Sequence, residues 1–237
     1  MKFSIIIPCY NEGKNIHQLL TRITPLQDKY NLEYILVENG SVDNSKSIFQ
    51  SEIEGDFPNV SIVYVPKNIG YGYGIQQGLL AASGDYIGWI HADMQMPPEE
   101  LYKFFDDALS RGDDRFFFKG VRTNRSSLDM FFTNGQSLVN SIMFRQKIYD
   151  VGAIPVIFHR SLLDYFCIQD MPNDFSIELF IYLIALQNNF KIIRHRVKLL
   201  DRENGSSSWN TGLSSKIRQA KRIYSDSILI KKGEKVL

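Results

Sequence analysis

Short apolar runs alternate with longer amphipathic segments through residues 1–100 of the chain. The longer segments repeat apolar residues at helical spacing over 16–23, 44–53 and 70–82. The short runs are rich in β-branched and aromatic residues, which is typical of buried strands, and lie at 2–8, 33–37, 60–65 and 86–90. Alternation of strands and helices at this length predicts right-handed βαβ units, and therefore an α/β fold with a mainly parallel sheet.

The pattern is less regular after residue 100. Helical spacing recurs over 101–109, 128–144 and 176–187, and strand-like runs lie at 115–121, 154–158 and 190–200. A polar, Gly- and Ser-rich loop then covers 201–212, which is long enough to suggest a function. Because the chain has no internal repeat and no clear linker, we expect one domain over 1–237, with an accessory half at 101–237.

Polar residues follow each of the first four predicted strands. They lie at 10–12, 38–41, 68–74 and 91–95. Ligands of open α/β sheets bind outside the carboxyl ends of the strands. We therefore expect these four polar tips to converge on one crevice.

The last of these tips has the strongest chemical pattern. His91, Asp93 and Gln95 alternate with Ala92 and Met94 directly after the apolar run 86–90. At the strand period of two, the three polar side chains would share one face. A carboxylate and an amide oxygen in this arrangement are hard ligands that suit Mg²⁺ or Mn²⁺. An ordinary polar strand end is the alternative interpretation.

Composition excludes several classes of protein. A formal net charge of +1 gives no strong field that would attract nucleic acid, and two cysteines, Cys9 and Cys167, are too few for a disulfide framework or a zinc cluster. The N-terminal apolar run reaches Pro8 too early for a signal peptide, and no run approaches the roughly 18 apolar residues of a membrane span. We expect a cytoplasmic protein.

The basic tail leaves contact with the inner membrane surface open. Apolar Ile217, Ala220, Ile223 and Tyr224 would share one helix face with cations beside it. A packed amphipathic helix with its lysines reaching into solvent explains the pattern equally well.

Five motifs occur in order along the chain and together resemble a known family. They are IIIPCYNE at 5–12, LVENGSVDNS at 36–45, NIGYGYGIQQGL at 68–79, GDYIGWIHADMQMPPEE at 84–100 and NDFSIELF at 173–180. The combination resembles the family 2 glycosyltransferases of the GT-A fold. ADMQ followed by two prolines is similar to the branch that contains polyprenol-phosphate sugar transferases. The resemblance covers nearly the whole chain and implies an inverting transferase whose donor is a nucleotide diphosphate sugar.

The resemblance implies a donor site in the first half of the chain. Tyr10 would stack on the base, Glu12 would accept from ribose hydroxyls, and Glu38 would contact the base. Asn39 stands where the family has a second acid, and its neutral side chain argues against a direct metal role. The full predicted donor set is Pro8, Tyr10, Asn11, Glu12, Glu38, Asn39, Gly40, Asn68, Gly70, Gly72, His91, Ala92, Asp93 and Arg122.

The glycines at 70, 72 and 74 do not indicate a dinucleotide site. They follow the third strand rather than the first, and their spacing is not GxGxxG. The resemblance instead implies that small residues let this loop approach the sugar or diphosphate.

The resemblance also implies that Asp93 and Gln95 hold a divalent cation, Mg²⁺ or Mn²⁺, that bridges the donor phosphates. His91 stands where the family often has Asp. We expect it to hydrogen-bond the ribose or phosphate rather than to bind the metal directly, which leaves the metal preference open.

The acceptor decides which catalytic residues are needed. A sugar hydroxyl needs a base, and Asp174 and Glu178, spaced i, i+4, are the candidates, although Asp174 could equally begin the helix. A lipid phosphate is already ionised, so cations would matter instead. The candidate cations are Lys119, Arg122, Arg125 and Arg202, among which the resemblance favours Arg122 and Arg202; the alternative is a solvated surface.

Three functions follow from these alternatives. The first is transfer to a sugar or glycolipid acceptor in surface-polysaccharide assembly. The second is transfer to a polyprenyl phosphate, and the third is a non-catalytic module that binds nucleotide sugars. The sequence indicates neither the donor's base and sugar nor an oligomeric state.

Overall fold

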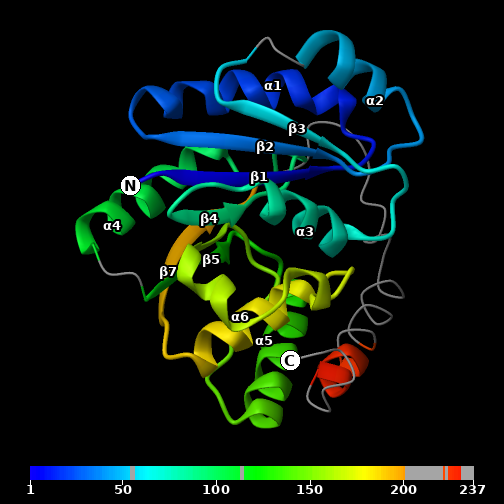
Figure 1. Cartoon of the computed structure of the whole chain (residues 1–237). Helices are drawn as coiled ribbons and strands as arrows, with labels where there is room; N and C mark the ends of the chain where they lie inside the picture. Colours follow the sequence, from blue (N-terminus) through cyan, green and yellow to red (C-terminus); the bar gives the residue numbers. More distant parts are fainter. Residues whose placement is uncertain (54–56, 113–114, 201–220, 222–223, 231–237) are drawn as a thin grey trace.

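A seven-stranded mixed sheet forms the centre of the computed structural model, which describes residues 1–53, 57–112, 115–200, 221 and 224–230 (Figure 1). The strand order is β3-β2-β1-β4-β6-β5-β7. Their bounds are Phe3–Cys9 (β1), Leu32–Glu38 (β2), Val60–Tyr64 (β3), Tyr86–Trp89 (β4), Phe116–Thr123 (β5), Val156–His159 (β6) and Lys191–Lys198 (β7).

All strands except β6 run in one direction. β1 pairs in parallel with β2 and β4, β2 with β3, and β5 with β7, whereas β6 is antiparallel to both β4 and β5. The prediction of a mainly parallel α/β sheet is confirmed. The carboxyl ends of six strands, β5 and β7 included, therefore lie at one edge of the sheet.

The helices agree with the predicted segments to within a few residues. They are α1 (Gly13–Ile23), α2 (Ser45–Ile48), α3 (Tyr71–Ala81), α4 (Tyr102–Arg111), α5 (Ser127–Phe144) and α6 (Ile177–Gln187). Short 3₁₀ segments are η1 (Thr24–Asp28), η3 (Pro98–Leu101), η4 (Arg160–Tyr165) and η5 (Ile168–Asp170), and a single-turn π-helix, η2 (Phe49–Ile53), continues α2.

The helices cover both faces of the sheet. On the face of α1 and α4, Arg22 pairs with Glu99 at 2.7 Å. On the opposite face, α3 packs closely on β1, where a Cβ at Gly78 would lie 2.3 Å from the Ile6 side chain. Figure 1 shows α1 and α3 on opposite sides of β1 and β2. α6 is buried along its length between Ile177 and Ala185, which explains its continuous apolar sequence.

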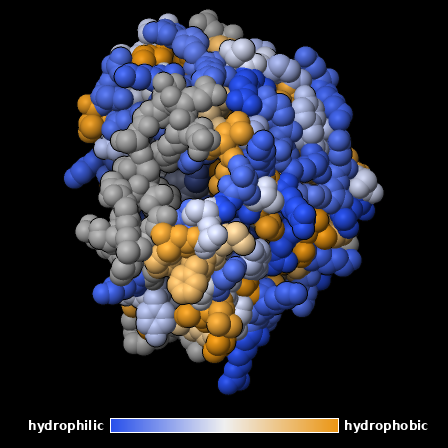
Figure 2. Space-filling view, turned by 180° about the vertical axis from the view of Figure 1, so that it is seen from behind, coloured by the Kyte–Doolittle hydropathy of each residue, from blue (hydrophilic) through white to orange (hydrophobic). Residues whose placement is uncertain are grey.

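α5 lies beside the helical residues 224–230, away from α1 (Figure 1). Ser227 Oγ donates to Asn140 Oδ1 at 2.9 Å, and Ile230 is fully buried. Figure 2, which shows the molecule from behind, has apolar side chains gathered in its lower part. The large apolar side chains that α5 exposes are Leu128, Met130, Phe131, Leu138, Val139 and Ile142.

The structure tests only part of the tail prediction. Ile217, Ala220 and Ile223 lie outside the described residues, so the predicted apolar face of the tail stays a prediction. Among the described residues, no helix combines the length and the hydropathy that crossing a membrane requires.

Candidate active site

The loops after β1 and β2 are joined by hydrogen bonds. Asn39 N donates to Cys9 O at 2.8 Å, and Asn11 N donates to Ser41 Oγ at 3.0 Å. In return, Val42 N donates to Asn11 Oδ1 at 3.0 Å. Asn11 has φ 57, a left-handed conformation that asparagine tolerates better than most residues. The first two predicted tips therefore form one structure.

The predicted donor residues in these loops differ in accessibility. Tyr10 is 42% exposed, so its ring can offer a stacking face, while Pro8 and Glu12 are half-buried. Glu12 Oε2 accepts from Asn15 Nδ2 at 2.5 Å. Glu38 is buried and accepts from Ser41 N at 2.7 Å, so its carboxylate stabilises the turn that follows β2. The predicted contacts of these residues with a nucleotide stay predictions.

The glycines at the start of α3 contact protein backbone. A Cβ at Gly70 would lie 2.0 Å from Asn173 O, and a Cβ at Gly72 would lie 2.2 Å from Pro172 O. Asn68 Oδ1 accepts from Gly70 N at 2.9 Å, and Asn39 Nδ2 donates to Gly70 O at 3.1 Å. These glycines let α3 pack against residues 172–174, and the predicted approach of this loop to the donor stays a prediction. Gly40, with φ 68, is similarly close to the backbone of Asn68.

The motif after β4 is a turn rather than a strand end. β4 ends at Trp89, Met94 has φ 60, and Asp93 Oδ1 accepts from Gln95 N at 3.1 Å. The prediction that His91, Asp93 and Gln95 share one strand face is wrong, because the chain reverses at Met94. Ala92 and Asp93 are buried, whereas His91 and Gln95 are partly exposed.

Hydrogen bonds connect this turn to the other tips. Tyr71, the first residue of α3, has its hydroxyl 3.1 Å from His91 Nε2. Leu200 N, beyond β7, donates to Gln95 O at 2.7 Å. Together with the contact between Asn39 and Gly70, these bonds confirm that the predicted polar tips converge.

Glu178, one of the two predicted bases, is the centre of a buried cluster. Its Oε1 accepts from Trp89 Nε1 at 2.8 Å and from the Tyr71 hydroxyl at 3.1 Å. Its Oε2 lies 3.9 Å from Lys119 Nζ. The residue is only 4% exposed. Burial and these partners hold Glu178 in the core, and its expected role as the base stays a prediction.

Lys119 is likewise a core residue and not a surface cation. It is fully buried in β5 and donates to Ala153 O at 2.8 Å. Burial lowers the pKa of Lys119 to about 8, against the opposing effect of the Glu178 carboxylate. Its expected place among exposed cations is corrected.

Tyr71 lies between this cluster and the turn after β4. Its ring stacks on Phe175 with centroids 4.8 Å apart. Burial raises the pKa of Tyr71 well above its ordinary value, and the nearby carboxylates of Glu178 and Asp93 raise it further. The phenol therefore keeps its proton and remains a hydrogen-bond donor.

Asp174 begins the turn before α6. Its Oδ1 accepts from Ser176 N at 2.9 Å and from the Ser176 hydroxyl. This geometry agrees with the alternative that Asp174 begins the helix, while its role as a base stays a prediction. Arg202, the third predicted catalytic residue, and the loop 201–212 lie outside the described residues.

Arg122 lies near the carboxyl end of β5, and Arg125 lies two residues beyond it. Arg122 Nε donates to Asp150 Oδ1 at 3.0 Å, and Arg122 N donates to Asp150 Oδ2 at 3.1 Å. Burial alone would raise the pKa of Asp150, but the Arg122 guanidinium outweighs it and holds that pKa below its usual value. Arg125 donates to the neutral hydroxyl of Thr133. Burial and then the Arg122 charge lower the Arg125 pKa. Asp150 already neutralises the charge of Arg122, and contact of Arg122 with a phosphate stays a prediction.

The turn after β4 offers a mixed set of possible metal ligands. The described residues contain no group of three or more His, Cys, Asp or Glu side chains that could hold a metal. Asp93, Gln95 and His91 instead supply one carboxylate, one amide and one imidazole. Such a partial set fits a divalent cation whose remaining ligands are phosphate oxygens and water.

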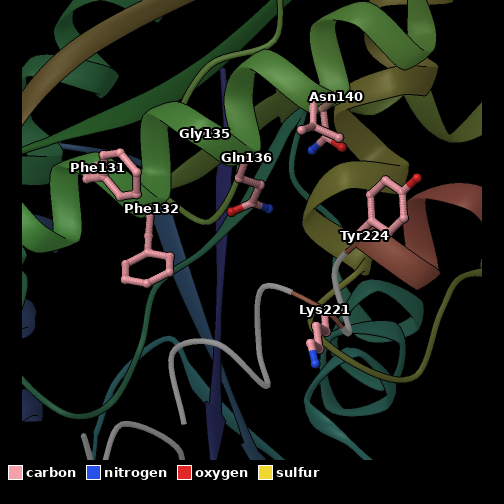
Figure 3. Close-up of a pocket in the computed structure, with 8 residues that line it drawn as sticks. Phe131, Phe132, Gly135, Gln136, Asn140, Lys221 and Tyr224 are labelled. Carbon is pink, nitrogen blue, oxygen red and sulfur yellow. The ribbon is translucent and has the colours of Figure 1, made fainter. Parts of the chain in front are cut away.

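A separate pocket of about 330 Å³ lies between α5 and the C-terminal helical segment. Figure 3 shows Phe132 and Gln136 from α5 on one side, and Lys221 and Tyr224 on the other. The pocket is also lined by Phe131, Gly135, Val139 and Asn140. None of the predicted donor residues lines it.

The sequence interpretation missed Tyr71, Trp89 and Asp150. A usable signal did exist for the buried pair. Lys119 interrupts the apolar run FFFKGV, and Glu178 is the one acid in the apolar run SIELFIYLI. Lone opposite charges in two buried segments predict an ion pair, because an unpaired buried charge is costly.

Comparisons with known proteins identify similar sequences and folds. A family model described as "Glycosyl transferase family 2" matches residues 4–163. Two curated relatives carry the name undecaprenyl-phosphate 4-deoxy-4-formamido-L-arabinose transferase. The relative from Pseudomonas fluorescens (strain SBW25) is 30% identical over 217 residues, and that from Proteus mirabilis (strain HI4320) is 25% identical over 214. The matches cover 87% and 88% of this chain but only 60% and 63% of the relatives' length.

A solved structure shares the fold. Glucosyl-3-phosphoglycerate synthase from Mycobacterium tuberculosis, crystallised with Mn²⁺, uridine diphosphate and glucosyl-3-phosphoglycerate, superposes with a TM-score of 0.72 at 16% identity. The match covers 98% of this chain and 80% of that one. At this identity the likeness concerns the fold alone.

Proposed function

Because the chain belongs to glycosyl transferase family 2, we propose that it transfers a sugar from a nucleotide diphosphate sugar to a polyprenyl phosphate. The names of the two curated relatives support this acceptor over the sugar or glycolipid acceptor that we placed first from the sequence. The chain spans about three-fifths of those relatives, so their activity is part of the proposal and not a finding.

The observation that carries the choice of acceptor is that a cationic residue near the end of β5 is followed directly by the exposed apolar side chains of α5. Arg125, two residues beyond the end of β5, lies at the edge of the sheet where the donor tips converge, next to Arg122, whose charge Asp150 already neutralises. α5 begins two residues after Arg125 and exposes apolar side chains, such as the 72% exposed Phe131. A cationic head followed by an apolar strip suits a ligand with a phosphate at one end and a hydrocarbon chain at the other.

The burial of Glu178 agrees with this acceptor. A phosphate monoester is already ionised at neutral pH, so its oxygen can attack the anomeric carbon without a protein base. Attack from the side opposite the leaving diphosphate would invert that carbon, as the family resemblance implies. A sugar hydroxyl would instead need a base such as Asp174.

The chain's own residues would bind and orient the donor. Tyr10 would stack on the base, and the joined loops after β1 and β2 would enclose the ribose. A divalent cation at Asp93 and Gln95 would supply positive charge to the departing diphosphate. Contact of α5 with the inner membrane surface would bring the lipid acceptor to the site, and nucleic acid has no part in this function.

The test is a transfer assay with purified protein. Sugars activated with UDP, GDP, dTDP or CDP are incubated with Mn²⁺ or Mg²⁺ and with undecaprenyl phosphate in detergent, and mass spectrometry follows a glycosyl phosphate lipid. A donor that yields this product supports the proposal. Glycosylation of sugar acceptors alone would overturn the choice of acceptor.

Two matched variants separate acceptor binding from donor binding. Ile142→Glu places a charge on the exposed α5 strip, whereas Leu109→Glu changes an apolar residue of α4 that is also exposed, at 46% against 70% for Ile142. We expect the first to lose lipid transfer while nucleotide still raises its melting temperature, and the second to retain both. Nucleotide binding without transfer to any acceptor would leave a non-catalytic binding module.

A further inference from the structure

His91 is held by a chain of hydrogen bonds that leads into the core. Its Nε2 lies 3.1 Å from the Tyr71 hydroxyl, and that hydroxyl donates to Glu178 Oε1 at 3.1 Å. The two rings meet edge to face, with centroids 5.4 Å apart. Three residues from the ends of β4, α3 and α6 are thus joined in one line.

Which atom donates the hydrogen in each of these bonds follows from Glu178, the buried end of the chain of hydrogen bonds. Glu178 accepts from Trp89 Nε1 and faces the Lys119 ammonium, so its carboxylate only accepts. The Tyr71 phenol has one hydrogen, which it donates to Glu178. The Tyr71 oxygen is then the acceptor for His91, whose Nε2 carries the hydrogen in a neutral imidazole.

This tautomer leaves His91 Nδ1 with a free lone pair. Within the described residues, the contact with Tyr71 is the hydrogen bond that His91 makes, and no side chain donates to Nδ1. Asp93, two residues further along the same turn, is buried. A partly exposed imidazole acceptor therefore accompanies the buried carboxylate in one turn.

We propose that His91 is a metal ligand of this chain, binding a divalent cation through Nδ1 together with Asp93, and that Tyr71 and Glu178 are positioning residues. This inference rests on the proposed function and decides what the sequence left open, since the hydrogen-bond chain presets the imidazole for ligation. Proteins usually orient a metal-ligating histidine by a hydrogen bond from the ring nitrogen that does not bind the metal. Imidazole suits Mn²⁺ far better than Mg²⁺, so the site selects Mn²⁺.

Pulsed electron paramagnetic resonance of bound Mn²⁺ tests the ligand directly. Mn²⁺ is added with UDP, GDP, dTDP or CDP to protein containing either ordinary or ¹⁵N-labelled histidine, so that histidine nitrogen is distinguished from nitrogen of the base. We expect a nitrogen coupling that changes with the label. His91→Gln loses this coupling, whereas His159→Gln, which alters a histidine at the opposite end of β4, retains it.

Affinity measurements test the positioning role. Tyr71→Phe keeps the ring that stacks on Phe175 but removes the acceptor for His91. We expect it to weaken Mn²⁺ binding about 10- to 100-fold, the usual effect of losing such a partner. His91→Asp restores a carboxylate and is expected to lower the ratio of Mn²⁺ to Mg²⁺ affinity in the presence of nucleotide.

The outcomes separate this inference from the proposed function. Bound Mn²⁺ without histidine coupling, in a protein that transfers sugar, overturns the ligand assignment alone. An unchanged metal preference in His91→Asp does the same. If Mn²⁺ binds with none of the four nucleotides, both proposals fall.

Discussion

The buried pair of Lys119 and Glu178 allows a quantitative test of the core next to the proposed site. The pair is weakly joined, because the charged atoms are 3.9 Å apart and Glu178 Oε2 has no hydrogen bond. Lys119→Met removes the cation and leaves the Glu178 charge buried and uncompensated. Loss of one partner of a buried pair typically costs about 3–5 kcal/mol, which is the expected loss in the free energy of unfolding.

Removing both charges should cost far less than removing one. The pKa of Lys119 falls from 10.5 to about 8 in the folded protein. At about 1.4 kcal/mol for each pH unit, keeping this lysine charged costs roughly 3 kcal/mol even with Glu178 beside it. In the double variant with Glu178→Gln this cost disappears, and the glutamine oxygen can still accept from Trp89 and Tyr71. We expect a stability within about 1 kcal/mol of the unmodified protein.

Urea unfolding at pH 7, followed by circular dichroism, measures all four proteins of the cycle. Circular dichroism is preferred because Trp89 is bonded to Glu178 and its fluorescence would report the substitution itself. If the losses of the two single variants simply add in the double variant, the two groups are not coupled and the reasoning is refuted.

Four further outcomes can be measured. Because the folded-state pKa of Lys119 is depressed, its destabilising effect is full below pH 8 and disappears between about pH 8 and 10.5, so the unmodified protein should gain stability over this range relative to the double variant. Gly72→Ala should lose at least about 1–3 kcal/mol in urea unfolding, since its Cβ meets Pro172 O at 2.2 Å, whereas Gly135→Ala on α5 has nothing within 4 Å and should gain up to about 1 kcal/mol. The depressed pKa of Asp150 stabilises the fold above the unfolded pKa of about 4, and an acid titration should therefore cost the unmodified protein more stability than Asp150→Asn. Asp93→Asn should abolish the part of a nucleotide-induced rise in melting temperature that a chelator removes, and an undiminished rise would demote Asp93 to a plain polar contact.

Periodicity was enough to predict where the strands and helices lie. The direction of β6 was not predictable, because the residues of a strand specify burial and spacing but not which way the strand runs beside its neighbours. The convergence of the polar tips was predictable, since it follows from parallel strands ending at one edge.

Side-chain partners were beyond the sequence pattern. Tyr71 and Glu178 are 107 residues apart, and no local propensity indicates that an aromatic residue at a helix start will bond a carboxylate in another helix. The alternation of His91, Asp93 and Gln95 was misleading, because a single left-handed residue, Met94, replaces the strand with a turn. The glycines at 70 and 72 were noticed correctly, but the backbone that requires them lies near residue 173.

The hydrogen bond from Leu200 N to Gln95 O fixes the number of residues between the start of β7 and the turn after β4. β7 is locked to β5 by a register of eight residue pairs, from Phe116 with Lys191 to Thr123 with Lys198. Inserting one residue between this register and Leu200 would add about 3.3 Å of chain and reverse the side-chain faces beyond it. A hydrogen bond of 2.7 Å would not survive that displacement. The number of residues from 191 to 200 is therefore constrained more tightly than their identities, and insertions in this stretch should be rarer among related sequences than substitutions at its exposed positions.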